Sequence, residues 1–413
     1  MIAAMTVKAC RALALALSVG VWFLTNAEWT VAEVPAPSTQ DVVAGNTAFA
    51  LDLYAKLRTA DGNLFFSPYS ISTALAMTYA GARGDTATQM AKVLHFQLKQ
   101  DQLHPAFAAL DERLNTIQKK GNVQLNVANS LWPQKKYPFL PDYLSQLKRY
   151  YGTSVTPLDY VKSPEAARKT INGWVEQKTH RKITDLIKRG ALNPLTRLVL
   201  ANAVYFKGKW TDPFDPKGTS DQPFHLSTNK DVTCRLMLHE GDHAYNETAD
   251  LQALALPYMG GDLSMIVLLP RKTDGLSALE SELTPAKLTE WVGPLGRRKV
   301  DVFLPKFTFT REFSLGQTLV AMGMPYPFSA LADFSGMDGR TNWLYISEVA
   351  HKAFVDVNEE GTEAAAATGV TVALAGAEPM PTVFRADHPF LFLIRDRYTG
   401  NILFIGRVVD PTQ

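Results

Sequence analysis

The chain is poor in cysteine, which limits how it can be stabilised covalently. Only two cysteines, Cys10 and Cys234, occur among its 413 residues. Cys10 precedes an apolar run of export-signal length, so removal of that region would leave Cys234 alone. An intramolecular disulfide is then excluded. A chain of this length with 46% hydrophobic residues can rely on a large core instead.

The chain also lacks an excess of charge of either sign. It has 42 basic and 40 acidic residues. Removal of residues 1–27 would take away Lys8 and Arg11 and no acidic residue, which leaves 40 basic residues against 40 acidic ones. This balance gives no support for a nucleic-acid partner or a membrane-surface partner.

Enzyme signatures are missing or incomplete. No GxSxG elbow, phosphate-binding loop or dinucleotide fingerprint is present. HEGDH, at residues 239–243, matches a zinc-protease pattern that requires a helix, whereas Gly241 and the strand-like CRLML before the motif favour a turn between strands. A zinc hydrolase is therefore the least favoured alternative. Ser145 and Lys148 fit an SxxK pattern without its partner motifs, which favours a solvated helix face.

The first 27 residues predict an export signal. MIAAMTVKACR supplies a short basic region, and ALALALSVGVWFL supplies an apolar run too short for a comfortable membrane span. Cleavage is expected after Ala27, with Ala32 as the second choice, and an uncleaved anchor is the alternative. Residues 28–40 are expected to be a flexible N-terminal segment and residues 41–413 a single domain, because no linker, repeat or long charge run divides them. The mature protein is expected to be secreted or periplasmic.

A stretch near the C-terminus lacks proline and almost lacks charge. GTEAAAATGVTVALAG, from Gly361 to Gly376, has Glu363 as its one charged residue. Proline would remove a ladder donor, and large or charged side chains would not fit a packed interior, so their absence is informative. Alternation puts one set of side chains on one face: Thr362, Ala364, Ala366, Thr368, Val370 and Val372. The only charge, Glu363, falls on the other face with Ala365, Ala367, Gly369, Thr371 and Ala373. The stretch could be an exposed loop or a buried strand, and composition alone also allows a linker or a short helix.

The residues around this stretch resemble those of a known family. An alternating run, LYISEVAHKAFVDVNEE, leads into it from Leu344, and VFRADHPFLFLIRD and NILFIGRVVDP follow as apolar strand patterns. Together they resemble the hinge, the C-terminal signature and the closing strand of the serpins. Further segments are similar to serpin segments and occur in serpin order: NLFFSPYSISTALAMTYAGARGDTATQM, LNVANSLW, INGWVEQKTHRKITDLI, LVLANAVYFKGKW, LSMIVLLP and ADFSGM. The resemblance covers nearly all of the chain after about residue 41.

The resemblance implies both a fold and a mechanism. The fold is α+β, with three β-sheets, about eight or nine helices and an exposed reactive loop that can insert as a strand into the main sheet. The function is suicide inhibition of serine endopeptidases, and by extension cysteine endopeptidases: the protease forms an acyl-enzyme with the loop, and insertion of the cut loop distorts the protease before deacylation. The protein is expected to be a monomer and not an enzyme. Its expected partner is the target protease, bound covalently. The native fold would then be kinetically stable.

The resemblance also assigns roles to residues beneath the loop. Glu359, at the base of the hinge, is expected to pair with Lys306, and Trp210 is expected to pack under the point where the loop enters the sheet. We call this group the breach. A second polar group, the shutter, is expected where the central strands separate: Ser67, Ser70, Asn202 and His351. A switch of this kind needs satisfied polar groups that can exchange partners.

The reactive bond is expected at Ala375–Gly376, thirteen residues after Thr362 as is usual in the family. The apolar residues before this bond suit a small specificity pocket, which favours an elastase-like or subtilisin-like target. Gly376 departs from the serine that is common after the cut, so cleavage at Leu374–Ala375 with chymotrypsin-like specificity is the alternative. A trypsin-like target is disfavoured because the loop has no Lys or Arg.

Within the family, a non-inhibitory carrier or chaperone is the main alternative. The alanines of the hinge disfavour it, because such members tend to have bulky, charged or proline residues there. No metal and no cofactor is expected. The region that matches the family's heparin-binding helix, residues 86–100, offers only Lys92 and Lys99, so a heparin-like cofactor is disfavoured. The sequon at Asn246 matters only in a host that glycosylates exported proteins.

Overall fold

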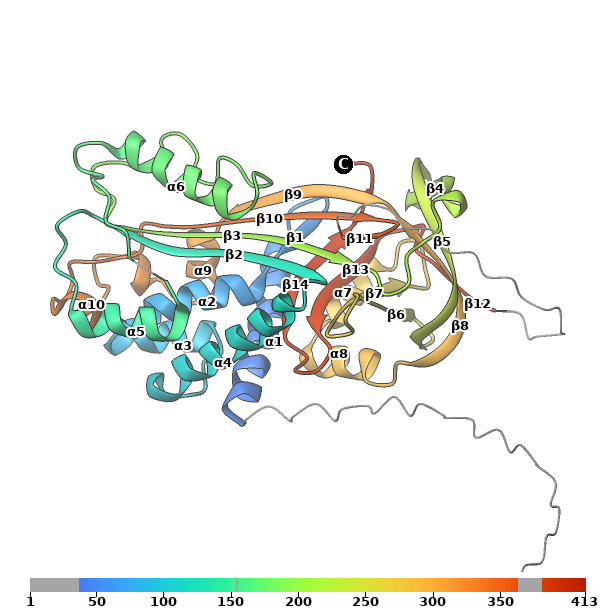
Figure 1. Cartoon of the computed structure of the whole chain (residues 1–413), viewed down its shortest axis with the longest axis horizontal. Helices are drawn as coiled ribbons and strands as arrows, with labels where there is room; N and C mark the ends of the chain where they lie inside the picture. Colours follow the sequence, from blue (N-terminus) through green and yellow to red (C-terminus); the bar gives the residue numbers. More distant parts are fainter. Residues whose placement is uncertain (1–36, 154, 363–380) are drawn as a thin grey trace, which may run out of the picture. The chain divides into compact units, whose positions relative to one another are not determined.

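The computed structural model describes residues 37–153, 155–362 and 381–413 (Figure 1). Over these residues the chain forms ten α-helices and two 3-10 helices. The α-helices are α1 (Pro37–Leu57), α2 (Pro68–Tyr79), α3 (Gly84–Val93), α4 (Gln100–Lys119), α5 (Pro141–Tyr151), α6 (Pro164–Lys178), α7 (Leu276–Glu282), α8 (Pro285–Val292), α9 (Gly316–Met322) and α10 (Ser335–Asp338). The 3-10 helices are η1 (Pro216–Gly218) and η2 (Tyr326–Phe328).

The strands of the described residues belong to two hydrogen-bonded sheets. The five-stranded sheet has the order β2-β3-β11-β10-β9 and is built from β2 (Val123–Pro133), β3 (Leu198–Lys209), β11 (Gly361–Thr362), β10 (Glu348–Asn358) and β9 (Phe307–Ser314). The nine-stranded sheet is built from β1 (Leu64–Phe66), β14 (Ile402–Val408), β13 (Phe390–Asp396), β7 (Leu263–Pro270), β6 (Leu251–Pro257), β5 (Lys230–Glu247), β8 (Gly296–Pro305), β12 (Thr382–Arg385) and β4 (Ser220–Ser227).

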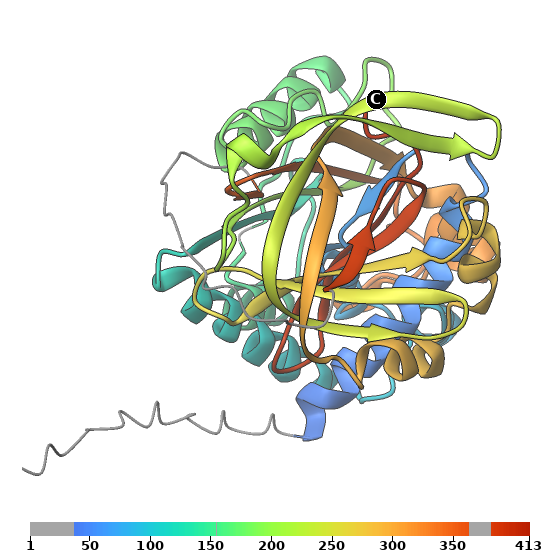
Figure 2. The same cartoon turned by 90° about the vertical axis from the view of Figure 1, so that its right-hand side faces the viewer.

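Strand β5 divides the nine-stranded sheet into two parts. Its first residues pair with β4, its middle pairs with β8, and its last residues, Ala244–Glu247, pair with β6. Figure 2 shows β5, in yellow-green, curving beside β8, in orange. A four-stranded part (β4, β5, β8, β12) and a six-stranded part (β5, β6, β7, β13, β14, β1) therefore share β5. With the five-stranded sheet they make up the three sheets predicted from the sequence.

The central strands of the five-stranded sheet are apolar on both faces because helices cover both faces. β3 is buried along almost its whole length, because α2 lies against one face of the five-stranded sheet and α6 against the other (Figure 1). α2 is itself a core helix. It starts at Pro68 after the Ser67 cap, and every residue except Thr73 is buried.

Helix α6 is held on its face of the sheet mainly by packing. Ile171 and Val175 of α6 and Ile183 of the following connection are fully buried against the alanine-rich face of β2 and β3. Each such side chain contributes about 2 kcal/mol when it leaves water. Apolar packing therefore already stabilises α6 on the sheet, and the polar contacts of the helix add to it.

The predicted α+β fold is thus confirmed, with a small difference in the helix count. The described residues form ten α-helices where eight or nine were predicted, and the shortest, α10, is a single turn that ends at Gly339 with a φ of +78°. No helix of the described residues is long and apolar enough to cross a membrane.

Candidate functional site

The main feature of the five-stranded sheet is a parallel boundary between β3 and β10, which we call the seam. Val199–Tyr205 of β3 pair in parallel with Glu348–Phe354 of β10, whereas β2 and β9 are antiparallel to their neighbours. Parallel pairing is slightly weaker per residue than antiparallel pairing. A strand placed between β3 and β10 in the opposite direction would replace one parallel boundary by two antiparallel ones.

One end of the seam already contains such a strand. β11, formed by Gly361 and Thr362, pairs antiparallel with Lys209 and Gly208 of β3 on one side and with β10 on the other. Gly361 has a φ of +152°, and a Cβ on this residue would lie 2.0 Å from the Gly208 carbonyl oxygen. Only glycine fits this position. The chain thus turns back from β10 and enters the sheet at this residue.

Thr362 points into the core. Its side chain is fully buried, and its Oγ1 lies 3.0 Å from the hydroxyl of Tyr258. The Tyr258 ring stacks on Trp210, with 4.7 Å between centroids and 15° between the ring planes. Trp210 Nε1 donates to the Asn358 carbonyl at 3.0 Å, and its backbone N-H donates to the Glu360 carbonyl at 2.8 Å. Trp210 therefore supports both the turn and the first inserted residues.

Glu359 lies at the same end of the seam and holds a negative charge there. Lys306 Nζ is 2.7 Å from Glu359 Oε2, and the Thr219 hydroxyl donates to Oε1 at 2.9 Å. Burial alone would raise the pKa of Glu359, but the hydrogen bonds from Lys306, from a backbone N-H and from Thr219 outweigh burial and hold the pKa below its usual value. The expected Glu359–Lys306 contact is present, and Thr219 is a partner that the sequence did not indicate.

The four shutter residues converge in the middle of the seam. Asn202 and His351 are directly opposite each other on β3 and β10, and His351 Nδ1 bonds to Asn202 Oδ1. His351 Nε2 accepts from the Ser67 backbone N-H at 3.1 Å. Asn202 Nδ2 donates to the Ser70 hydroxyl at 2.6 Å. This cluster joins α2 to both strands of the seam.

A fifth member of this cluster was missed from the sequence. Asn129 of β2 is paired with Asn202 in the strand register, and its Oδ1 accepts from Asn202 Nδ2 and from the Ser70 hydroxyl. Three neighbouring strands therefore present one polar row, Asn129, Asn202 and His351. His351 is fully buried, and this burial lowers its pKa to about 3, so the ring is neutral at physiological pH.

The rest of the predicted loop lies outside the described residues. This applies to the inserting positions after the hinge, Ala364, Ala366, Thr368, Val370 and Val372, and to the predicted reactive bond and its alternative, Leu374, Ala375 and Gly376.

HEGDH lies inside β5, so the predicted turn is wrong. His239 and His243 point to the same side of the strand, and His239 Nδ1 is 2.9 Å from His243 Nε2. The two rings meet over Gly241, where a Cβ would lie 2.8 Å from His239 Cε1, so the glycine allows the ladder with β8 to continue. The helix required by zinc-protease chemistry is not formed. Within the described ranges, no group of three His, Cys, Asp or Glu side chains could hold a metal ion.

The other two motifs have structural surroundings of their own. Ser145 and Lys148 are exposed on α5, in agreement with the predicted solvated helix face. Asn246 is half-buried in β5, and its Nδ2 donates to the Trp291 carbonyl at 3.0 Å. A glycan on Asn246 would have to displace this hydrogen bond.

Comparisons with known proteins agree with this geometry. A family model described as serpin (serine protease inhibitor) matches residues 44–411. The leukocyte elastase inhibitor of Bos taurus is 43% identical over 382 residues, which cover 90% of this chain and 100% of that protein. The structure of uncleaved ovalbumin matches with a TM-score of 0.82 and 33% identity, over 90% of this chain and 100% of that chain. Human thyroxine-binding globulin matches with a TM-score of 0.82 and 32% identity, over 91% and 100% of the two chains.

Proposed function

Because the chain belongs to the serpin family, we propose that it traps elastase-like or subtilisin-like serine endopeptidases as a suicide substrate. It is a protease inhibitor and not an enzyme. The elastase-like preference is supported by the relatives named leukocyte elastase inhibitor and by the small apolar residues before the expected reactive bond, Ala375–Gly376. We propose that the inhibitor is a monomer and that its complex with the protease is a covalent acyl-enzyme.

The observation that carries this proposal is the position of β11. Its two residues are antiparallel to both β3 and β10, and they stand at the end of the seam where a longer strand would begin. If the strand continued in this register, Thr368 would come between Asn202 and His351, and Ala375 would come beside Leu195. The even-numbered face that points inward at Thr362 carries no charged residue, whereas Glu363 is on the odd-numbered face.

The same register predicts how far a bound protease would travel. Thirteen residues of extended strand span about 40 Å. An acyl bond at Ala375 would therefore move from one end of the seam to the other. A groove of about 350 Å³ lies at that far end, lined by residues that include Leu195, Thr196, Tyr345 and Ile346. The protease would end against this base, and a displacement of its active-site groups by about 1 Å is enough to slow deacylation about a hundredfold.

Free energy for this movement comes from completing the sheet. About a dozen additional ladder hydrogen bonds, at about 1 kcal/mol each, together with burial of small apolar side chains, supply more than about 10 kcal/mol. The native form is then a kinetically held state, since the parallel seam must open before the strand can enter. The neutral shutter can exchange its hydrogen bonds during this opening, because the Thr368 hydroxyl could bond to Asn202 or His351.

A gel assay tests the proposed function. The protein is incubated separately with pancreatic elastase, subtilisin, chymotrypsin and trypsin, and is then boiled in detergent. We expect a covalent band with at least one of the first three proteases, with the summed mass less the released C-terminal fragment. Mass spectrometry of that fragment distinguishes cleavage after Ala375 from cleavage after Leu374. Clean loop cleavage by every protease without such a band would contradict inhibition and favour a carrier.

We further propose that the protein is exported and that residues 1–27 are removed. The support is the basic region followed by an apolar run of signal length. Expression of the full chain with a C-terminal tag should give a product outside the cytoplasm that begins at Glu28, or at Glu33 if Ala32 is the cleavage site. Arginine at Leu15 and Leu17 should abolish this export. A product that keeps Met1 inside the cell would overturn the proposal.

A further inference from the structure

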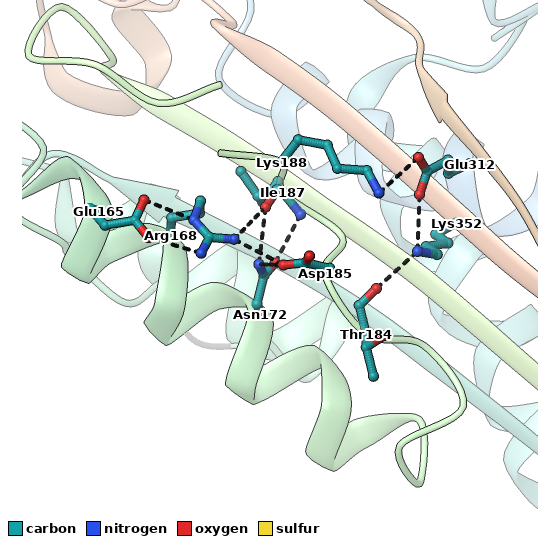
Figure 3. A network of polar contacts seen from close by, with 9 residues as sticks. All are labelled: Glu165, Arg168, Asn172, Thr184, Asp185, Ile187, Lys188, Glu312 and Lys352. Carbon is teal, nitrogen blue, oxygen red and sulfur yellow. Dashed lines mark hydrogen bonds and ion pairs between the residues drawn. The ribbon is translucent and has the colours of Figure 1, made fainter. Parts of the chain in front are cut away.

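An ionic bridge crosses the seam on the face of the sheet that carries α6 (Figure 3). Glu312 of β9 contacts Lys188, in the connection from α6 to β3, and Lys352 of β10, each at 2.9 Å. Lys352 Nζ also donates to the Thr184 carbonyl of that connection at 2.9 Å. We call these four residues the latch: Thr184, Lys188, Glu312 and Lys352.

One side of the latch is fixed to α6. Arg168 of α6 pairs with Glu165 at 2.9 Å and donates to Asp185 at 2.9 Å and to the Ile187 carbonyl at 3.0 Å. Asn172 of α6 accepts from the Ile187 N-H at 2.8 Å and donates to the Ile187 carbonyl at 3.0 Å. Figure 3 shows that these bonds hold the connection against the helix. The apolar cluster under α6 is formed mainly with β2 and β3, and only Ala350 and Phe354 of β10 reach its edge. Apart from the latch and the Lys182 ammonium over the Phe354 ring at 5.3 Å, we therefore expect the connection to move with the β3 side of the seam.

The other side of the latch belongs to β9 and β10. Lys352 and Glu312 are cross-strand partners in the register of these two strands, so their ion pair moves as one body. A new strand between β3 and β10 separates the two sides by about 4.8 Å, the spacing of neighbouring strands. The Lys188–Glu312 and Lys352–Thr184 contacts cannot span this extra distance while the connection stays on β3. They must break or shift, whereas the Lys352–Glu312 pair can persist.

We propose that the latch sets the rate of loop insertion and therefore the partition of the acylated protease between trapping and release. The inference rests on the proposed function, because only an inserting loop forces the two sides apart. Insertion competes with deacylation, so a slower opening of the seam releases more protease and consumes more inhibitor. Lys188 and Glu312 act as positioning residues, since neither contacts the reactive bond.

The charges needed for this role are held in place. The Lys352 side chain is only 12% exposed and has Glu312 and the Thr184 carbonyl as partners. Burial alone would raise the pKa of Glu312, but the hydrogen bonds from Lys352 and Lys188 outweigh it and lower the pKa. The carboxylate is therefore ionised at neutral pH, where it can hold a cation on each side.

The test measures insertion without a protease. A synthetic peptide with the sequence of residues 362–374 is added to the intact protein, and its uptake is followed by native gel and native mass spectrometry. The variants are Lys188→Gln, Glu312→Gln, the double variant and the conservative Lys188→Arg. Lys287→Gln is the matched control, since it removes an ion pair with Glu290 at 3.0 Å on α8, away from the seam.

We expect Lys188→Gln and Glu312→Gln each to speed peptide uptake by about two- to fivefold, the range for a partly exposed ion pair. The double variant should be no faster than Glu312→Gln, because the two residues act through one contact. Lys188→Arg and Lys287→Gln should match the unmodified protein. Raising salt from about 0.05 M to 1 M should speed uptake by the unmodified protein more than by Lys188→Gln. The faster variants should also consume fewer inhibitor molecules per protease trapped.

Three contradicting results have different meanings. Peptide uptake at equal rates by the unmodified protein and Lys188→Gln would overturn the latch and leave the proposed function standing. No uptake by any variant, together with no covalent protease band, would overturn the proposed function itself. Additive effects in the double variant would show that the residues do not act through their contact, and would also overturn the latch.

Discussion

The breach and the shutter lie along the same seam but are held by different interactions. The breach depends on a charged pair, Glu359 with Lys306, on the rings of Trp210 and Tyr258, and on a strand that has already entered. The shutter depends on neutral side chains that are wholly buried, with His351 and Asn202 joined across two strands that have not separated.

This difference indicates a division of labour. An ion pair at this end of the seam can hold the turn between β10 and β11 in place. A buried neutral cluster can exchange one hydroxyl or amide partner for another without leaving a charge unpaired, which would cost several kcal/mol. We therefore propose that the breach favours the start of insertion and that the shutter is one of the contacts that resist further opening of the seam.

The largest expected effect comes from a charge on the inserting face at the breach. Thr362→Arg would place a guanidinium where a fully buried hydroxyl now meets Tyr258, and burial of an unpaired charge costs several kcal/mol. We expect the inhibitor to become a substrate, with at least about tenfold more molecules cleaved per protease trapped. The stoichiometry is measured by titration of residual protease activity.

The matched control for this change is Glu363→Arg. Alternation puts position 363 on the opposite face, so the same side chain there should disturb trapping far less. Cleavage of Thr362→Arg should still occur at the same bond. Near one-to-one trapping by Thr362→Arg would show that the assignment of the buried face is wrong.

The next largest effect is expected in the shutter. Asn202→Ala would remove a partner from His351, Ser70 and Asn129 at once, and buried polar groups left unsatisfied cost about 1–3 kcal/mol each. We expect a loss of about 2–4 kcal/mol in the free energy of unfolding and faster spontaneous conversion to an inserted form. Both are measured by denaturant titration and by native gel after warming.

Asn126→Ala is the control for the shutter prediction. Asn126 is on the same strand as Asn129, and its Nδ2 has no hydrogen-bond partner among the described residues. Its loss should therefore change stability by less than about 1 kcal/mol. Equal effects of the two changes would mean that the polar row does not stabilise the seam.

The shutter and the breach should lose their contributions to stability over different pH ranges. His351 has its pKa lowered to about 3 by burial, so the unfolded chain binds a proton below its ordinary value of about 6.5 and the folded chain does not. The contribution of His351 to the free energy of unfolding is therefore fully present above about pH 6.5. It falls by up to about 1.4 kcal/mol per pH unit as the pH is lowered to about 3. Glu359 loses its contribution only below about pH 4.5, since its pKa is lowered in the folded state.

The measurement is the free energy of unfolding of the unmodified protein and of His351→Gln at pH 7, 6 and 5. Three further histidines, His104, His239 and His243, also have lowered pKa values because of burial or partial burial, so only the difference between the two proteins reports on position 351. We expect the slope with pH to be shallower in the variant by about 1 kcal/mol per unit. Parallel slopes would contradict a neutral, buried His351.

The sequence predicted the fold through segments that are shared over most of the chain, but it predicted the site unevenly. Lys306 and Glu359 were found because each belongs to a recognisable segment. Thr219 was missed, since it lies in a connection with no periodic pattern and is brought to Glu359 only by the folding of distant strands. Asn129 had a signal, namely an amide among the mostly buried residues 128–133 of β2, where a polar side chain needs a partner. The predicted turn at HEGDH was wrong because Gly241 makes room for the rings of His239 and His243 within a continuous strand, and the sequence does not show this packing.

The smallest expected effect is at the breach itself. Lys306 is 37% exposed and Glu359 is 11% exposed, so solvent screens their ion pair to below about 1 kcal/mol. Lys306→Met should lower the free energy of unfolding by about 0.5–1 kcal/mol at pH 7, while Lys306→Arg should change it little. Because the Glu359 charge is lost as pH falls below about 4.5, the difference between Lys306→Met and the unmodified protein should shrink towards pH 3. A difference that persisted at pH 3 would mean that Lys306 acts through packing of its alkyl chain, and the electrostatic contrast between breach and shutter would then fail.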